Sequence, residues 1–291
     1  MQEISFSARE YQSDQTFQTV NYRYAGSPES GWTIEREGEP YLQLGAGYVP
    51  VRSRACGICA TDLARHRLPF PLPQITGHEV TGVYQQQRVA IEINASHLAR
   101  GVETAGCLYC SNHLDSHCPQ RMTLGIDRLP GGFAPWVLAP INAIHVLPGT
   151  ISDAVGVLIE PFAAALRAVM LSPPEKGDRV AVLGPRRLGM LLIAALQAYR
   201  QQHGLVFEIV GLMRHPRLQP VAETLGADSV IILGQDSSSE PERDFDIVYD
   251  TTGNIDGFAL AARLAKRTLH LKSTNGQAVM GLEHLTSMGI N

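Results

Sequence analysis

The chain has 291 residues, which is enough for two compact domains that each bury a core of their own. Its composition, 44% hydrophobic and 18% charged, is that of an ordinary soluble globular protein, and no apolar run approaches the roughly 18 residues that span a bilayer. The net charge of −4 and the scattered arginines argue against a nucleic-acid-binding surface. These properties argue against membrane and nucleic-acid partners and favour chemistry on small molecules.

The first residues, Met1–Phe6, lack the basic start and apolar core of a signal peptide, so we expect a reducing, cytoplasmic compartment. In such a compartment the five cysteines are expected to be metal ligands or core residues rather than disulfide partners.

Residues 1–150 are rich in glycine, proline and short β-type runs such as 48–51 and 88–91, which predicts a mostly β domain. From Asp153 to Met170, apolar residues recur at helical spacing until Ser172-Pro173-Pro174 ends the pattern. This pattern predicts one helix between the two halves of the chain.

Beyond this helix, strand and helix patterns alternate, as in a doubly wound α/β domain with a parallel sheet. The polar segment 235–243 is predicted to be a surface loop. The predicted domains are therefore 1–150 and 151–291. The predicted strands of the second domain are 179–183, 207–212, 229–233 and 246–249, and its predicted helices are 188–199 and 217–225.

Three short segments carry cysteine, histidine and glutamate residues, which are common metal ligands in proteins. The segment Cys56-Gly57-Ile58-Cys59-Ala60-Thr61-Asp62 is followed by Gly77-His78-Glu79 and later by Ile159-Glu160-Pro161-Phe162. Zinc accepts thiolate, imidazole and carboxylate ligands in tetrahedral geometry, and a catalytic zinc keeps one position open. Taken alone, the Cys-x2-Cys pair is equally consistent with a structural metal knuckle, His78 with a core histidine, and Glu160 with a surface glutamate. The order and combination of the three segments therefore carry the prediction.

The ordered segments resemble the medium-chain dehydrogenase/reductase superfamily, in particular its zinc-dependent alcohol, polyol and threonine dehydrogenase-like members. Gly131-Gly132-Phe133-Ala134 and the glycine turn at 184–189 extend the resemblance, which covers about residues 40–280. It implies an α/β protein with a GroES-like, mostly β catalytic domain and a Rossmann domain. It also implies an enzyme that transfers a hydride between a small-molecule alcohol or carbonyl substrate and NAD(P).

The resemblance also implies roles for individual residues. Cys59 and His78 are implied zinc ligands, with Glu79 as a ligand or a close carboxylate that supports the ligands. Glu160 is implied as the third protein ligand or its water-mediated substitute. Thr61 matches the hydroxyl that contacts the substrate oxygen and relays its proton.

Two neighbouring positions are expected to stand outside this chemistry. Cys56 is implied to be a non-ligand. Many relatives have a histidine five residues after the zinc cysteine that passes the proton to solvent, and this chain has Ala64 there, with His66 two residues on. The proton relay is therefore expected to be rerouted or weaker.

A second cysteine group, Cys107, Cys110 and Cys118, corresponds to the lobe in which relatives hold a structural zinc with four cysteines. Thr104 stands at the position of the first cysteine. Three thiolates alone cannot close a tetrahedral structural site, so either a nearby side chain completes it or the lobe holds no metal and its cysteines are small buried residues. The candidates for a fourth ligand are His97, Glu103, His113 and His117.

The segment Val180–Gly189 predicts the strand, turn and helix that hold a dinucleotide phosphate, but Arg186 replaces the middle glycine of the usual G-x-G-x-x-G motif. Helix N-terminal amides and the arginines can still meet an anion, or Arg186 can fill the groove of a domain that binds cofactor poorly. The expected cofactor-binding residues are Gly184, Arg186, Arg187, Leu188, Gly189, Arg214 and Thr252.

The choice between NAD(H) and NADP(H) depends on the end of the second strand of this domain. An Asp or Glu normally binds the ribose hydroxyls of NAD there, whereas this chain has Met213 followed by Arg214. A missing carboxylate and a nearby arginine favour the 2′-phosphate of NADP(H).

The competing hypothesis is a non-catalytic or regulatory member of the same fold with a degenerate cofactor site. It is suggested by Ala64, Thr104 and Arg186, and by the short segment that follows residues 268–273. Because many relatives use the longer segment at the dimer edge, the oligomeric state is left open, with a homodimer as one possibility. Zinc-free quinone reductases of the superfamily are disfavoured because they lack the Cys/His/Glu set.

Overall fold

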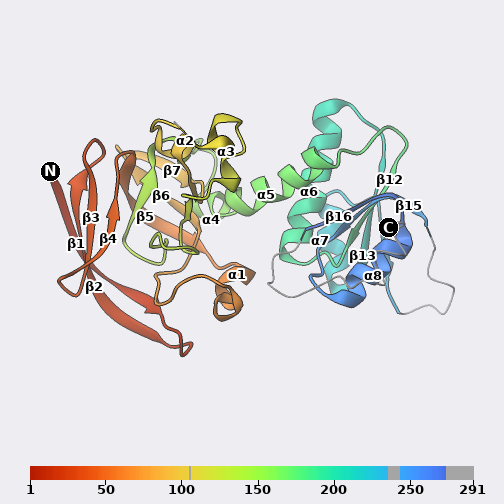
Figure 1. Ribbon diagram of the computed structural model, residues 1–291. Helices are drawn as coiled ribbons and strands as arrows, with labels where there is room; N and C mark the ends of the chain where they lie inside the picture. The colour runs from red at the N-terminus through yellow and green to blue at the C-terminus, as the bar shows by residue number, and fades with distance from the viewer. Residues whose placement is uncertain (105, 235–242, 273–291) are drawn as a thin grey trace. The chain divides into compact units, whose positions relative to one another are not determined.

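A computed structural model describes residues 1–104, 106–234 and 243–272 of the chain (Figure 1). The chain divides into two compact units, Met1–Glu160 and Pro161–Asn291. The described part of the first unit is built from two larger antiparallel sheets and a two-stranded antiparallel sheet, and that of the second from one parallel sheet. The GroES-like and Rossmann parts of the fold prediction are thereby confirmed.

The first sheet is an antiparallel meander in the order β1-β2-β3-β4. Alternate residues of β2 are buried, as expected for a strand with one face on a core, and Tyr22 and Tyr24 pack there with Trp32 of β3. Glu10 is fully buried in this unit, where its carboxylate accepts two hydrogen bonds of 2.7 Å from Arg36. The strands are β1 (Gln2–Tyr11), β2 (Phe17–Ser27), β3 (Gly31–Arg36) and β4 (Glu39–Leu44).

The second sheet has the order β10-β5-β6-β7-β11, and two of the three predicted metal-binding segments, 56–62 and 77–79, lie at the end of β5 and the start of β6. The predicted runs 48–51 and 88–91 lie within β5 and β7. The five strands are β5 (Tyr48–Gly57), β6 (Glu79–Tyr84), β7 (Gln87–Ile91), β10 (Trp136–Pro140) and β11 (Ile144–Val146). Short elements between them are α1 (Ala60–Leu63), η1 (Arg65–Arg67), β8 (Asn94–Ala95), α2 (His97–Arg100), α3 (Leu108–Ser111), η2 (Asp115–His117), β9 (Met122–Thr123) and η3 (Ile141–Ala143).

The single helix predicted over 153–170 is wrong, because the structure contains two helices, α4 (Asp153–Gly156) and α5 (Ile159–Leu171). Pro161 explains the break. A proline ring clashes with the carbonyl four residues earlier and its nitrogen has no hydrogen to donate, so the helix cannot run unbroken through residue 157. Proline is tolerated in the first turn of α5, where the backbone N–H groups have no partner within the helix.

By length and composition alone, the same segment, Asp153–Leu171, passes as a membrane-spanning helix, with a mean hydropathy of 1.8 over its most apolar window. By mean hydropathy, this 19-residue segment therefore contradicts the expectation that no apolar run approaches the length needed to span a bilayer. The segment is interrupted after Gly156 and includes the charged residues Glu160 and Arg167. Core helices of soluble proteins meet the same criterion, so the finding is weak evidence for a membrane span.

The second unit contains a parallel sheet in the order β14-β13-β12-β15-β16. Val180 and Val182 of β12 belong to a core with α5 and α6, whereas Ala181 and Leu183 belong to a core with α8, so helices cover both faces. Residues 235–242 of the predicted polar loop lie outside the described residues. The elements are β12 (Arg179–Leu183), α6 (Arg187–His203), β13 (Glu208–Met213), η4 (Pro216–Leu218), α7 (Gln219–Thr224), β14 (Ser229–Ile232), β15 (Phe245–Asp250), α8 (Ile255–Leu264) and β16 (Ala265–Leu271).

Candidate functional site

Asp62 joins the two segments that carry the first group of metal-binding side chains. One of its carboxylate oxygens accepts a hydrogen bond from the backbone N–H of Cys59 at 2.8 Å, and the other accepts one from the N–H of Gly77 at 3.0 Å. Cys59 precedes α1 and Asp62 is the third residue of that helix, a spacing typical of a capping box. This spacing is the signal for a role of Asp62 that the family resemblance alone did not assign.

Cys59, His78 and Glu79 each place one ligand atom within 4.8 Å of the other two. His78 and Glu79 are buried, and Cys59 is half-buried. His78 Nδ1 is buried without a hydrogen-bond partner, and it lies 3.7 Å from Asp62 Oδ1. Thiolate, imidazole and carboxylate are donors that zinc accepts, so the chemistry of this set fits a bound cation.

The charge around His78 favours the binding of a cation. Burial alone would lower the pKa of His78, but the Asp62 carboxylate and the Cys59 thiol outweigh burial and raise it to about 10. A metal ion that uses this imidazole must therefore displace a proton. Metal binding to the group is expected to weaken as the pH falls.

Glycine at two positions lets the backbone approach this group closely. A Cβ at Gly57 would lie 2.1 Å from Oε2 of Glu79, its partner across β5 and β6. Gly77 has a φ of +91°, and a Cβ there would lie 2.8 Å from Cys56 Sγ and 2.9 Å from the Phe133 ring. Cys56 is not a member of the metal-binding group, and burial raises its pKa to about 12, so it remains a packed thiol.

The Gly-Gly-Phe-Ala motif supports the segment that precedes His78. The N–H groups of Gly131 and Phe133 donate hydrogen bonds to the carbonyls of Ile75 and Thr76, at 2.8 and 3.1 Å. The N–H of Gly132 donates to the carbonyl of Gly77 at 2.8 Å. Residues 131–133 therefore hold the backbone that positions the histidine.

The remaining residues of the predicted catalytic set lie in different settings. The Sγ of Cys59 donates a hydrogen bond to Oγ1 of Thr61 at 3.7 Å, so the Thr61 hydroxyl lies beside the metal-binding group. Glu160 is in the first turn of α5 and is not a member of the group. Ala64 directly follows α1, and exposed His66 accepts a hydrogen bond from Arg67 at 3.3 Å.

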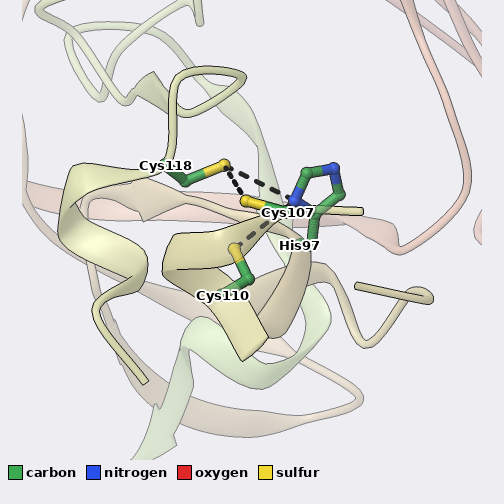
Figure 2. A group of neighbouring side chains, drawn as sticks. All are labelled: His97, Cys107, Cys110 and Cys118. Carbon is green, nitrogen blue, oxygen red and sulfur yellow. Dashed lines mark hydrogen bonds between the residues drawn. The ribbon is translucent and has the colours of Figure 1, made fainter. Parts of the chain in front are cut away.

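A second group of possible metal ligands consists of His97, Cys107, Cys110 and Cys118, whose ligand atoms also lie within 4.8 Å of one another (Figure 2). Cys110 and Cys118 are buried, and Cys107 is half-buried. Thr104 is not a member; its carbonyl accepts a hydrogen bond from the Cys107 N–H at 2.9 Å. The other three candidates for a fourth ligand, Glu103, His113 and His117, are also outside the group.

The predicted phosphate turn lies where the strand order of the parallel sheet reverses, between β12 and β15. Gly184 follows β12 with a φ of +71°, and Thr251 and Thr252 follow β15. A Cβ at Gly184 would lie 2.7 Å from Cγ2 of Thr252, so the structure brings these two residues together. In open α/β sheets, ligands bind in the crevice at such a switch point.

The other predicted cofactor residues open α6. Arg186 precedes the helix, Arg187 is its first residue, and both side chains are exposed. Leu188 packs against the core, and a Cβ at the buried Gly189 would lie 2.7 Å from Oγ1 of Thr251. The helix N-terminus is therefore packed closely against the turn that follows β15, with two arginines free to meet an anion.

Arg214 follows β13 directly and is exposed. No carboxylate occurs from Gly211 to Leu218, so the end of this strand offers a cation where NAD-binding domains usually offer an acid.

Comparison with known proteins agrees with this architecture. Residues 45–149 match the alcohol dehydrogenase GroES-like domain. The chain is 27% identical over 256 residues to L-threonine 3-dehydrogenase of Pectobacterium carotovorum, which covers 79% of this chain and 69% of that protein. It is 30% identical over 249 residues to (R,R)-butanediol dehydrogenase of Bacillus subtilis, which covers 77% of this chain and 65% of that protein. The alignments thus span about two thirds of these relatives.

Solved structures show the same fold. A putative zinc-binding dehydrogenase from Sinorhizobium meliloti bound to NADP superposes with a TM-score of 0.73 at 21% identity, covering 98% of this chain and 82% of that one. Acetophenone reductase from Geotrichum candidum in complex with NAD gives a TM-score of 0.69 at 18% identity, covering 91% of this chain and 82% of that one. The match to the GroES-like domain, the sequence relatives and the fold support the predicted resemblance to zinc-dependent alcohol and polyol dehydrogenases of the medium-chain dehydrogenase/reductase superfamily.

Proposed function

We propose that this protein is a zinc-dependent oxidoreductase that transfers a hydride between an alcohol or carbonyl substrate and NADP(H), with NAD(H) as the less favoured cofactor. The observation that carries the proposal is the convergence of Cys59, His78 and Glu79 on one point, with the Thr61 hydroxyl alongside. Three donors of this kind leave the fourth tetrahedral position free for a substrate oxygen, as in catalytic rather than structural zinc sites.

In this proposal, Cys59, His78 and Glu79 hold the zinc. The bound zinc would polarise the substrate oxygen, and the nicotinamide would accept or donate the hydride. Oxidation of an alcohol also releases the hydroxyl proton; the Thr61 hydroxyl can accept this proton while it donates its own to solvent, and so is placed to relay it. Asp62 holds the Cys59 and Gly77 segments together and so positions the donors.

Glu79 and Glu160 compete for the role of carboxylate ligand. Glu79 is buried within the group of donors, which favours it, whereas the family resemblance suggests Glu160. We therefore expect Glu79→Gln to lower the zinc affinity more than Glu160→Gln does. The opposite order would transfer the role to Glu160.

The cofactor proposal rests on the residues of the second unit. Gly184, Gly189 and Thr252 form the turn at the switch point, and the arginines at 186 and 187 supply positive charge for the phosphates. Exposed Arg214 is the group proposed to meet the 2′-phosphate. Direct titration with NADPH and NADH tests this, and a lower dissociation constant for NADH would contradict it.

The activity test uses a panel taken from the relatives: L-threonine, sorbitol and (R,R)-butanediol, each with NADP⁺ and NAD⁺. The zinc content of the purified chain is measured in parallel by elemental mass spectrometry. We expect Cys59→Ser to abolish turnover of any active substrate, while the matched variant Cys56→Ser, in the same motif but outside the group, keeps its zinc. Full turnover by Cys59→Ser would refute the proposed site. Absence of nucleotide binding would favour a non-catalytic relative.

A further inference from the structure

We infer that the lobe formed by residues 96–120 holds a tetrahedral metal ion, zinc foremost, through the thiolates of Cys107, Cys110 and Cys118 and through Nδ1 of His97. In this assignment His97, from α2, takes the place of the cysteine that relatives have at the position of Thr104, and the site becomes Cys₃His (Figure 2). The inference does not depend on the proposed enzymatic activity.

Three distances among the donors match those of a zinc tetrahedron. The Sγ atoms of Cys107 and Cys118 are 3.8 Å apart, and Nδ1 of His97 lies 3.4 Å from the Sγ atoms of Cys110 and Cys118. With Zn–S bonds near 2.3 Å and Zn–N bonds near 2.0 Å, tetrahedral angles give an S···S distance of about 3.8 Å and an N···S distance of about 3.5 Å. The three separations agree with these values to within a few tenths of an ångström.

The second nitrogen of His97 is also engaged. Nε2 lies 2.9 Å from Oε1 of Gln120, which can only accept a hydrogen bond. A proton on Nε2 leaves the lone pair of Nδ1 directed at the sulfurs, which is the tautomer that a metal ligand needs. Gln120 is therefore a positioning residue for His97.

Local hydrogen bonds fix the element that carries His97. The Ser96 hydroxyl accepts a hydrogen bond from the N–H of Ala99 at the start of α2 and donates one to Oδ2 of Asp115 at 3.0 Å. Asp115 opens η2, and its carbonyl accepts a hydrogen bond from the N–H of Cys118 at 3.0 Å. The backbones that present His97 and Cys118 are thus tied together by Ser96 and Asp115.

The lobe has little apolar core of its own. Among the described residues from 96 to 118, the buried ones are only Ser96, Ala99, Cys110 and Cys118. The large apolar side chains Leu108 and Leu114 are 73% and 51% exposed. A bound metal would supply the cohesion that packing does not, as structural zinc does in small domains.

The test uses cobalt(II) in place of zinc in a Cys59→Ser background. This substitution removes the thiol of the first group, so thiolate-to-cobalt charge-transfer absorption reports the lobe alone. We expect one cobalt per chain to give this absorption, and His97→Ala to weaken cobalt binding by at least roughly tenfold. His97→Cys is expected to keep tight binding and to strengthen the absorption by about one third, because four thiolates then replace three.

Control variants separate a ligand from a residue that merely packs. His113→Ala and His117→Ala, histidines of the same lobe outside the group, should leave the cobalt affinity and spectrum unchanged. Gln120→Ala should weaken binding about tenfold or more while keeping a three-thiolate spectrum. The inference is overturned if the background chain shows no charge-transfer absorption, or if His97→Ala binds cobalt with unchanged affinity and spectrum.

Discussion

Replacing Asp62 by asparagine is the most direct test of how the first metal-binding group is held. The carboxylate accepts one backbone hydrogen bond on each oxygen, from Cys59 at 2.8 Å and from Gly77 at 3.0 Å, and its side chain is 7% exposed. Asparagine keeps only one carbonyl oxygen. One buried N–H donor then faces an NH₂ group, and the other hydrogen bond loses its charge.

The magnitude follows from these two losses. An unsatisfied buried donor costs about 1–3 kcal/mol, and a neutral acceptor in place of a charged one costs about 1 kcal/mol more. We therefore expect Asp62→Asn to lower the free energy of unfolding of the zinc-free first unit by about 2–4 kcal/mol. Both tryptophans of the chain, Trp32 and Trp136, lie in this unit, so urea unfolding followed by tryptophan fluorescence reports it specifically.

Asp153→Asn is the matched control. Asp153 also accepts two hydrogen bonds, but from the side chains of Arg54 and Arg88, which are 53% and 31% exposed. Exposed ion pairs contribute about 0–1 kcal/mol each, so this variant, which weakens two of them, should lose less than about 2 kcal/mol. Equal losses for the two variants would refute the positioning role of Asp62, as would an unchanged zinc affinity in Asp62→Asn, for which we expect a decrease of roughly 10- to 100-fold.

Gly57→Ala is expected to lower the zinc affinity of the first group at least about tenfold, because the new Cβ would lie 2.1 Å from Oε2 of Glu79. Chelator competition measures this, and Gly149→Ala, with nothing within 4 Å, should have no effect. Burial alone would raise the pKa of Glu10, but hydrogen bonds from the Arg36 guanidinium and the Tyr22 hydroxyl outweigh burial and hold this pKa below 4.5. The contribution of the Glu10 carboxylate to stability is therefore present above pH 4.5 and is lost as the pH falls through the lowered pKa. The free energies of unfolding of wild type and Glu10→Gln are measured against pH, and parallel curves would contradict this expectation. Arg214→Glu should raise the dissociation constant of NADPH by roughly 10- to 100-fold and leave that of NADH nearly unchanged. Fluorescence titrations measure both constants, and an equal loss of affinity for the two nucleotides would contradict a role of Arg214 in binding the 2′-phosphate.

The second unit was largely predictable because its periodicity is strong. Buried parallel strands contain continuous apolar runs, such as residues 180–183 of β12, and the helices between them show apolar residues at helical spacing. The main error, one helix over 153–170, arose because the apolar pattern continues through residue 157 while the backbone cannot. Pro161 was visible in the sequence, and its effect on the preceding turn should have outweighed the pattern.

The metal-binding groups were predictable only in part. The resemblance named Cys59, His78 and Glu79, and their proximity in space is a property of the structure that spacing alone does not reveal. The choice of His97 among four candidates depends on α2 folding back onto the cysteine segment, a tertiary contact without a local signal. The role of Asp62 could have been predicted, because its spacing from Cys59 is that of a helix cap.

The hydrogen bonds between residues 131–133 and the segment 75–77 have a consequence for the order in which the chain assembles. The backbone before His78 is completed by a segment that the ribosome makes much later. A nascent chain arrested before residue 131 would contain every donor of the first group without the backbone that presents His78 to the other donors. Stable capture of the metal by this group therefore has to wait until nearly all of the first unit has been synthesised.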